Sequence, residues 1–250
     1  MKNNRIELVF ILDRSGSMGG LETDTIGGFN GMLKKQQAAE GECLVTTVLF
    51  DDEYELLHNR MDIHEVKPMT DKEYYVRGCT ALYDAVGRTI HTIAAEQRPD
   101  DKVLFVIITD GYENSSTEYT GPKVKAAIEK MKTERNWQFV FLGANIDAAE
   151  VAEEIGIDRE MAAEYAADEE GTSLNYEVLS DMAMDFRLSE GDTVGCAPLE
   201  RIRRYKGSKE RWAKAQRPQS LRRSDKQTSD REPFRFSFRQ NCCAFYRKFI

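Results

Sequence analysis

Short, almost continuous apolar runs recur along the chain, separated by longer segments of mixed polarity. The runs cover residues 6–12, 44–50, 103–109 and 139–142. A strand that is covered on both faces has no solvent-facing side, so it reads as an uninterrupted apolar run rather than as an alternation of polar and apolar residues. The four runs therefore predict parallel strands that lie inside a domain.

The segments between these runs carry apolar residues at helical spacing. The four stripes are Ile26, Phe29 and Leu33; Leu82, Val86, Ile90 and Ile93; Val124, Ala127, Ile128 and Met131; and Ala148, Val151, Ala152 and Ile155. Signals for helix ends accompany them. Pro122 stands where a helix starts, and Asp147 with Glu150 resembles a capping box whose helix closes at Gly156.

Strands that alternate with helices predict an α/β fold of the Rossmann-like kind, in which a mostly parallel central sheet has helices on both faces. Residues 54–57 are a candidate antiparallel edge strand. The order of the strands stays open, because a single sequence does not reveal which strands are neighbours.

Charge divides the chain into two parts. Residues 189–250 hold 16 Lys and Arg against 7 Asp and Glu, whereas residues 1–188 hold 19 against 36. The second part is rich in Arg, Lys, Ser and Gln, and its apolar residues are too sparse for a core. We expect a domain at residues 1–188 and a basic, disordered tail at residues 189–250. The tail is a solvated appendage, an altered reading frame at the end of the gene, or an arm for nucleic acid or a membrane surface.

Composition argues against several functional classes. A formal net charge of -8 and a pI near 5.2 disfavour nucleic acid as the main partner. No stretch approaches the roughly 18 consecutive apolar residues of a membrane helix, and no cleavage site follows the first apolar run. The five cysteines form no CxxC pair and the three histidines are scattered, which disfavours zinc and a disulfide framework. We expect a cytoplasmic protein that does not contact the membrane.

Two of the apolar runs end in an acidic residue, Asp13 after VFIL and Asp110 after VIIT. In an open parallel sheet, ligands bind beyond the carboxyl ends of the strands. Ser15 and Ser17 follow the first acid, and Thr80 opens a predicted helix in GCTALYDA. These five side chains are hard oxygen donors without sulfur or imidazole, a set that suits Mg²⁺ or Mn²⁺.

The motifs DxSxS, a threonine before a central helix, and TDG after a later strand resemble the metal-ion-dependent adhesion site, MIDAS, of von Willebrand factor A domains. The resemblance extends over about residues 6–187, with three separated motif parts in the correct order. The chain is most similar to short, stand-alone bacterial members, in which segments like FLGANIDAAEVAEEIGI follow the last motif.

The resemblance implies a role for each matching residue. Ser15, Ser17 and Thr80 would offer hydroxyls to the metal, and Asp13 and Asp110 would hold it directly or through water. The sixth position would be open, or occupied by an Asp or Glu carboxylate of a partner protein. Hydroxyl ligands add no negative charge to that of the two carboxylates, so the ion keeps a positive character that favours an outside anion. The implied function is a metal-dependent protein-binding module that is not an enzyme.

An alternative function is a Mg²⁺-dependent phosphohydrolase with Asp13 as its nucleophile. Such an enzyme would normally have a second acid two residues further on, where this chain has Ser15, and also a well-placed lysine. The acidic stretch DDEYE at residues 51–55 is either a second cation site or, more simply, a loop between strands. Cys79, next to Thr80, is either a small packing residue or a reactive thiol.

Overall fold

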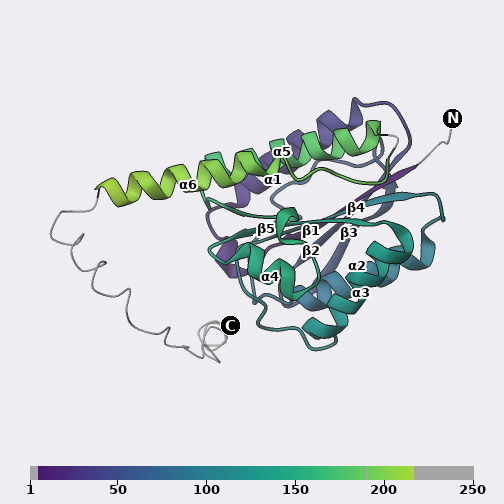
Figure 1. The fold of residues 1–250 in the computed structure, drawn as a ribbon, viewed down its shortest axis with the longest axis horizontal. Coiled ribbons are helices and arrows are strands. Elements are labelled where there is room, and N and C mark those ends of the chain that lie inside the picture. Colours follow the sequence, from purple (N-terminus) through teal and green to yellow (C-terminus); the bar gives the residue numbers. More distant parts are fainter. Residues whose placement is uncertain (1–4, 190, 217–250) are drawn as a thin grey trace.

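A six-stranded sheet runs through the middle of the computed structural model, which describes residues 5–189 and 191–216 (Figure 1). The strands are β1 (Ile6–Asp13), β2 (Cys43–Phe50), β3 (Tyr54–Asp62), β4 (Lys102–Thr109), β5 (Gln138–Ala144) and β6 (Ala162–Tyr165). They lie in the order β3-β2-β1-β4-β5-β6, and only β3 is antiparallel to its neighbour. The predicted sheet and its antiparallel edge strand are confirmed, whereas β6 was not predicted.

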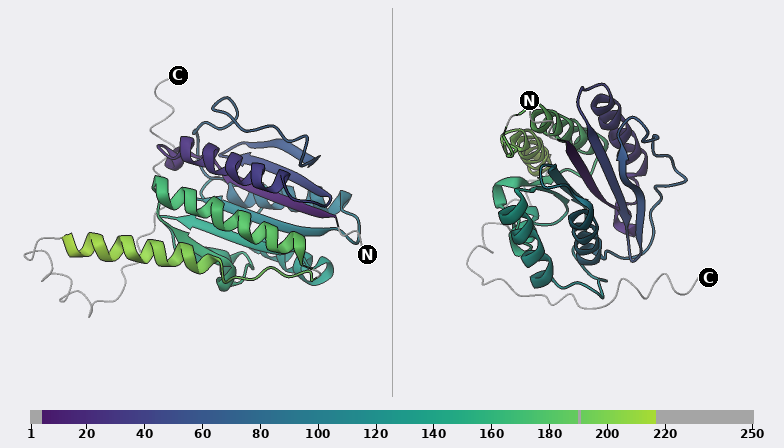
Figure 2. Two further views of the ribbon diagram at one scale, coloured as in Figure 1. Left: turned by 90° about the horizontal axis from the view of Figure 1, so that it is seen from above. Right: turned by 90° about the vertical axis from the view of Figure 1, so that its right-hand side faces the viewer.

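The helices form a layer on each face of the sheet (Figures 1 and 2). One face is covered by α1 (Glu22–Gln37), α5 (Glu169–Leu188) and α6 (Leu199–Gln216), and the other by α2 (Leu82–Glu96), α3 (Gly121–Arg135) and α4 (Ala148–Glu154). Two short 3₁₀ turns, η1 (Gly16–Met18) and η2 (Arg159–Met161), complete the described elements. None of the described helices is long and apolar enough to cross a membrane.

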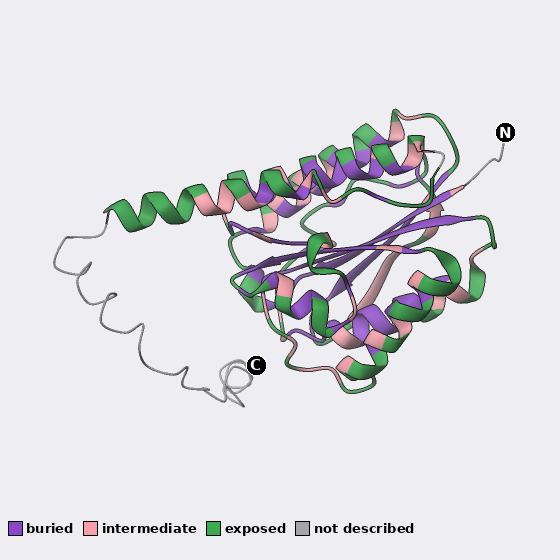
Figure 3. Ribbon diagram, in the orientation of Figure 1, coloured by how far each residue is buried: buried purple, intermediate pink, exposed green. Residues whose placement is uncertain are grey.

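Each central strand contributes to two hydrophobic cores, because successive side chains of a strand point to opposite faces. On β1, Leu8 and Phe10 join the core under α1 and α5, while Val9 and Ile11 join the core over α2 and α3. Figure 3 shows the buried sheet between two helix layers with exposed outer sides. This two-sided burial is the physical reason for the uninterrupted apolar runs in the sequence.

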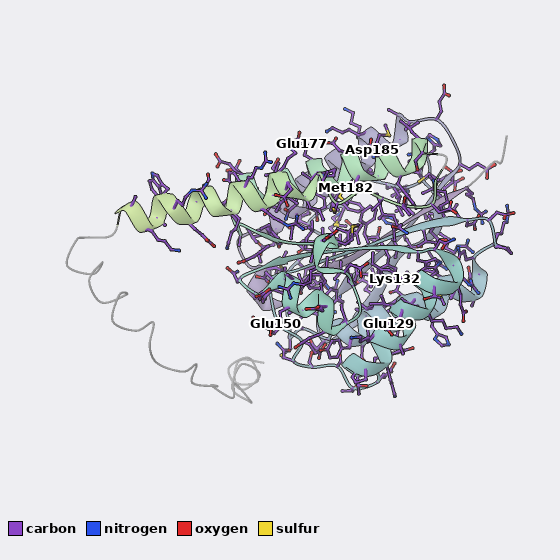
Figure 4. All side chains as sticks on the ribbon, viewed as in Figure 1. Glu129, Lys132, Glu150, Glu177, Met182 and Asp185 are labelled. Atoms are coloured by element: carbon purple, nitrogen blue, oxygen red, sulfur yellow. The ribbon has the colours of Figure 1, made fainter. Side chains whose placement is uncertain are left out.

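The outer helix layers are amphipathic, both in the four helices that the stripes predict and in α5, which no stripe predicted. On α5, Met182 is buried in the core, whereas Glu177 and Asp185 are exposed (Figure 4). The predicted helix ends are also present. The Asp147 carboxylate accepts a hydrogen bond from the Glu150 amide at 2.9 Å at the start of α4, and a proline stands in the first turn of α3.

The expectation of low order from residue 189 onwards is wrong for residues 199–216, which form α6. Leu199 and Ile202 are 0% and 1% exposed and belong to the core with α5. The Arg203 guanidinium donates to the carbonyl oxygens of Glu160 and Ala162, next to the edge strand β6. Most other residues of this helix are exposed and polar, so the amino-acid composition of α6 resembles that of a solvated segment. Residues 217–250, the rest of the predicted tail, lie outside the described residues.

Candidate metal centre

The two predicted acidic ligands stand at the point where the sheet changes direction. β1 and β4 are neighbours, but the chain continues from β1 to β2 on one side and from β4 to β5 on the other. In open parallel sheets such a switch point creates a crevice beyond the carboxyl ends of the strands. Asp13 is the last residue of β1, and Asp110 directly follows β4. The two carboxylates therefore flank this crevice.

A chain of hydrogen bonds connects the DxSxS motif to Asp110. The Ser17 hydroxyl donates to Asp110 Oδ1 at 2.5 Å, and the hydroxyl oxygens of Ser15 and Ser17 are 3.0 Å apart. The Ser15 amide donates to Asp13 Oδ1 at 2.7 Å. Residues 93 positions apart in sequence thus form one connected oxygen cluster.

Thr80 reaches the same cluster from the segment before α2. A methyl group added at Gly111 would lie 3.3 Å from Thr80 Oγ1 and 3.4 Å from Ser17 Oγ, so both hydroxyls face this glycine. The structure therefore brings together all five side chains named from the sequence. Asp13, Ser15, Thr80 and Asp110 are buried, whereas Ser17 is exposed, which leaves the cluster open to solvent on one side.

Thr109 is a functional candidate that the sequence analysis missed. Its hydroxyl donates to Asp13 Oδ2 at 2.5 Å, from the last residue of the neighbouring strand β4. Together with the Ser15 amide, it leaves each Asp13 oxygen with one donor. The threonine belongs to the TDG motif, but its contact with Asp13 depends on β1 and β4 being neighbours.

The acidic stretch at residues 51–55 pairs with arginines. Residues 51–53 form the loop between β2 and β3, as interpreted from the sequence, whereas Tyr54 and Glu55 already belong to β3. Asp51 Oδ2 lies 3.0 Å from Arg14 Nε and 2.6 Å from Arg77 Nε. Glu55 pairs with Arg14 at 2.6 Å, and Glu53 pairs with Arg77. These two arginines compensate part of the negative charge of the stretch. They also fasten the Asp13 loop to the segment before Thr80, where the Arg77 amide donates to the Arg14 carbonyl oxygen at 2.9 Å.

Neither Asp13 nor Asp110 forms an ion pair with any residue that the structure describes. Burial raises the pKa of Asp13 to about 6, although hydrogen bonds from Thr109 and Ser15 act in the opposite direction. Burial also raises the pKa of Asp110, against a hydrogen bond from Ser17. A bound cation would relieve this cost, because it favours the ionised form of both carboxyl groups.

The chemistry of the donor set fits a hard divalent cation. It comprises two carboxylates and three hydroxyls that converge at one crevice, and oxygen ligands of this kind suit Mg²⁺ and Mn²⁺. Over residues 5–189 and 191–216, no group of three or more His, Cys, Asp or Glu side chains has a metal-binding arrangement. The hydroxyl-containing cluster is therefore the candidate metal centre.

A groove of about 780 Å³ is lined by residues at the start of α4, by β6 and by α6. Tyr112, two residues after Asp110, also lines it. The Tyr112 side chain is 55% exposed, and its hydroxyl accepts a hydrogen bond from the Asp147 amide at 3.3 Å. Tyr112 is therefore an exposed aromatic residue of the groove that lies two positions from Asp110 in the sequence.

Comparison with known proteins identifies the fold. No protein-family model and no curated protein sequence matches the chain. Among solved structures, a von Willebrand factor type A protein from Catenulispora acidiphila matches with a TM-score of 0.54 and 14% identity, over 72% of this chain and 43% of that one. The pilus adhesin SpaC of Lactobacillus rhamnosus GG matches with a TM-score of 0.59 and 12% identity, over 74% and 30%.

A third similar structure is proximal thread matrix protein 1 of the mussel byssus, in a form with a zinc-occupied MIDAS motif. It has a TM-score of 0.50 and 15% identity, over 72% of this chain and 46% of that one. The match thus spans less than half the length of each of these three proteins. The likeness establishes that this chain has the von Willebrand factor A fold, as the motifs predict.

Proposed function

We propose that this protein is a divalent-metal-dependent protein-binding module. Asp13, Ser15, Ser17, Thr80 and Asp110 hold Mg²⁺ or Mn²⁺, and an Asp or Glu carboxylate of a partner protein completes the coordination. The observation that carries this proposal is the convergence of these five oxygen donors around two buried carboxylates without an ion-pair partner among the described residues. The zinc-occupied MIDAS motif of the mussel protein supports a divalent ion in this fold.

The charge balance of the donors supports an acidic partner. Two carboxylates neutralise a divalent ion formally, but three of the five ligands are neutral hydroxyls, which donate less electron density than carboxylates do. The bound ion would therefore supply an electrophilic centre that attracts an external anion. Ser17 is the exposed member of the cluster, so the partner approaches from its side.

Metal identity is part of the proposal, because the mussel protein contains zinc in its MIDAS. Oxygen-only donors favour Mg²⁺ and Mn²⁺, whereas zinc sites in proteins are usually built with nitrogen or sulfur ligands. Calorimetric titration of the metal-free protein with each ion tests this point. We expect saturable binding of Mg²⁺ and Mn²⁺ at a single site. Binding of Zn²⁺ alone would contradict the assignment.

We also propose that the site is not catalytic. A phosphohydrolase with Asp13 as its nucleophile would normally have a second acid two residues further on and a well-placed lysine. The second acid that such an enzyme would normally have is replaced by Ser15. Assays with p-nitrophenyl phosphate and Mg²⁺ should show no turnover. Hydrolysis that disappears in an Asp13→Asn variant would establish the enzyme instead.

The partner-binding experiment uses the immobilised full chain in Mg²⁺ and again in EDTA. We expect a protein ligand that is retained in Mg²⁺, released by EDTA and not captured by a Thr80→Ala variant. Ser15→Asp should still bind the metal but lose the partner, because a third carboxylate gives the metal site a net negative charge that repels the incoming acid. A partner that is retained equally in EDTA would contradict the proposal.

Tyr112 offers a test of the surface around the metal. Exposed aromatic side chains near the centre of an interface often supply much of the binding energy. Tyr112→Ala should therefore weaken partner binding by more than tenfold, about 1.4 kcal/mol, and leave Mn²⁺ affinity unchanged. Trp212→Ala is the matched control, because Trp212 is also exposed but does not line the groove. Equal effects of the two substitutions would show that Tyr112 has no special role.

A further inference from the structure

Thr80 stands just before α2, at a helix start that its own sequence does not cap. The N-cap residue is Ala81, which has no side-chain acceptor for the free amides of the first turn. The loop after Asp110 supplies the missing acceptors. The Glu113 carboxylate accepts from the Tyr83 amide at 2.9 Å, and the Ser116 hydroxyl oxygen accepts from the Asp84 amide at 3.0 Å. The segment that follows one metal ligand therefore caps the helix that follows another.

Between these two capping residues, Asn114 binds the backbone of Thr80 itself. The Thr80 backbone amide donates to Asn114 Oδ1 at 2.8 Å, and the Asn114 backbone amide donates to the Thr80 carbonyl oxygen at 3.0 Å. The Ser115 backbone amide donates to the same carbonyl oxygen at 3.3 Å. Asn114 thus contacts both backbone polar groups of Thr80, and its side chain holds the amide. Rotation of the Thr80 backbone would break at least one of these bonds, so the direction of its side chain is restrained.

We propose that Asn114 is a positioning residue of the metal site, and this inference rests on the metal-binding function proposed above. Asn114 directs the Thr80 hydroxyl toward the Asp110 carboxylate and fixes the distance between these two ligands. Groups that orient metal ligands through hydrogen bonds commonly change metal affinity by about 10- to 100-fold when they are removed. Asn114 lies four residues after Asp110 and is exposed apart from its contact with Thr80.

The control is Asn30, whose side chain also binds the backbone of one loop residue but does not contact any of the five proposed ligands. Its side-chain oxygen accepts from the Met69 amide at 2.8 Å, and its side-chain nitrogen donates to the Met69 carbonyl oxygen at 2.8 Å. Asn30→Ala therefore removes two side-chain hydrogen bonds without touching a ligand, whereas Asn114→Ala removes one, so the control is the larger perturbation. If Asn114 had only a structural role, Asn114→Ala and Asn30→Ala would have similar Mn²⁺ affinities.

The first experiment measures Mn²⁺ affinity of the full chain by calorimetry and by the electron paramagnetic resonance signal of free Mn²⁺. We expect about tenfold weaker binding in Asn114→Ala and unchanged binding in Asn30→Ala. The double variant Asn114→Ala/Thr80→Ala should bind no more weakly than Thr80→Ala alone, because Asn114 acts through Thr80. Unchanged affinity in Asn114→Ala, or additive losses in the double variant, would overturn the inference.

The second experiment reads the hydrogen bond itself, through amide exchange at Thr80 in metal-free protein. Protection of this amide should be lost in Asn114→Ala and retained in Asn114→Asp, which keeps an acceptor oxygen. Full protection in Asn114→Ala would also overturn the inference. Absence of Mn²⁺ binding by the unaltered protein would instead refute the proposed function, so the two failures are distinguishable.

Discussion

Both ends of β1 bury a carboxylate, but only the carboxylate at the amino end pairs with an arginine of the described chain. Glu7, near the amino end of the strand, is 0% exposed, and Asp13, at the carboxyl end, is 1% exposed. Removing a carboxylate from water is costly unless its charge is compensated. A buried carboxylate that pairs with an arginine of the chain is typical of a structural role. One that lacks such a partner is a candidate for binding an external cation.

At the amino end, the chain supplies the cations itself. Both carboxylate oxygens of Glu7 accept from Arg60 Nε, at 3.1 and 3.2 Å. Arg60 also lies 3.3 Å from Asp101, which pairs with Arg5 at 2.6 Å. Burial raises the pKa of Glu7, and the nearby Arg60 charge opposes this shift. The network is closed and needs no external ion.

At the carboxyl end, arginines are present but do not reach the ligand carboxylates. Arg14 follows Asp13 directly, yet its guanidinium turns to Asp51 and Glu55. Asp13 and Asp110 accept only from hydroxyls and a backbone amide among the described residues. The metal ion proposed above would supply, from solution, the positive charge that the described residues do not place beside Asp13 and Asp110.

The largest effect is expected from replacing the buried carboxylate at each end of β1 in turn. Asp13→Asn should weaken Mn²⁺ binding at least ~100-fold, because it removes one of the two charged ligands. The same change should maintain or raise the thermal midpoint of the metal-free protein, since it removes a buried charge without an ion-pair partner. Glu7→Gln is the control and should lower the midpoint while metal affinity stays unchanged. A lower midpoint with unchanged Mn²⁺ affinity in Asp13→Asn, and weaker Mn²⁺ binding in Glu7→Gln, would contradict the proposed difference between the two ends of β1.

The second effect concerns stability at the amino end. Arg60→Ala leaves Glu7 buried without its cation, and breaking a buried pair costs about 3 kcal/mol or more. Urea unfolding should show this loss, with no change in Mn²⁺ affinity at the other end of the sheet. A loss of metal affinity comparable to that of Asp13→Asn would show that the two ends are not independent.

A smaller effect is expected where Asp13 is oriented by its neighbour. Thr109→Val keeps the shape of the side chain but removes the hydroxyl that donates to Asp13. We expect about tenfold weaker Mn²⁺ binding, as is usual for groups that orient a ligand. Thr89→Val is the matched control, because Thr89 is a buried threonine of α2 whose hydroxyl bonds to Ala85. Calorimetry should find the control unchanged.

The smallest effect near neutral pH is that of protonation. Since the pKa of Asp13 is about 6 without metal, a proton competes with the ion below this pH, and affinity should fall up to about tenfold per pH unit. Titrations from pH 8 to 5 test this. In metal-free protein the raised pKa means that protonation of Asp13 stabilises the fold. That contribution is complete below its ordinary value of 3.8 and is lost as pH rises through about 6. Affinity that does not change with pH would contradict the burial of an uncompensated Asp13.

The hydrophobic pattern of the sequence was sufficient to predict four of the six strands and four of the six helices that the structure describes, and the position of the two acidic ligands. The uninterrupted runs predicted four parallel strands, because a strand between two helix layers has no polar face. The helical stripes, Pro122 and the cap at Asp147 predicted α1, α2, α3 and α4. Asp13 and Asp110 were identified because each directly follows an apolar run, and chain direction alone places such residues at the carboxyl edge of a parallel sheet.

Tertiary structure decided everything that depends on which segments are neighbours. Strand β6 has only four residues, and the first turn of α6 supplies the buried Leu199 and Ile202, so neither has enough local periodicity to be recognised. Thr109 meets Asp13 only because β4 lies beside β1, and Asn114 meets Thr80 only because a loop returns to the start of α2. Hydrophobic periodicity reports how one segment is buried, whereas hydrogen bonds between distant segments depend on strand order and loop path, which local periodicity does not encode.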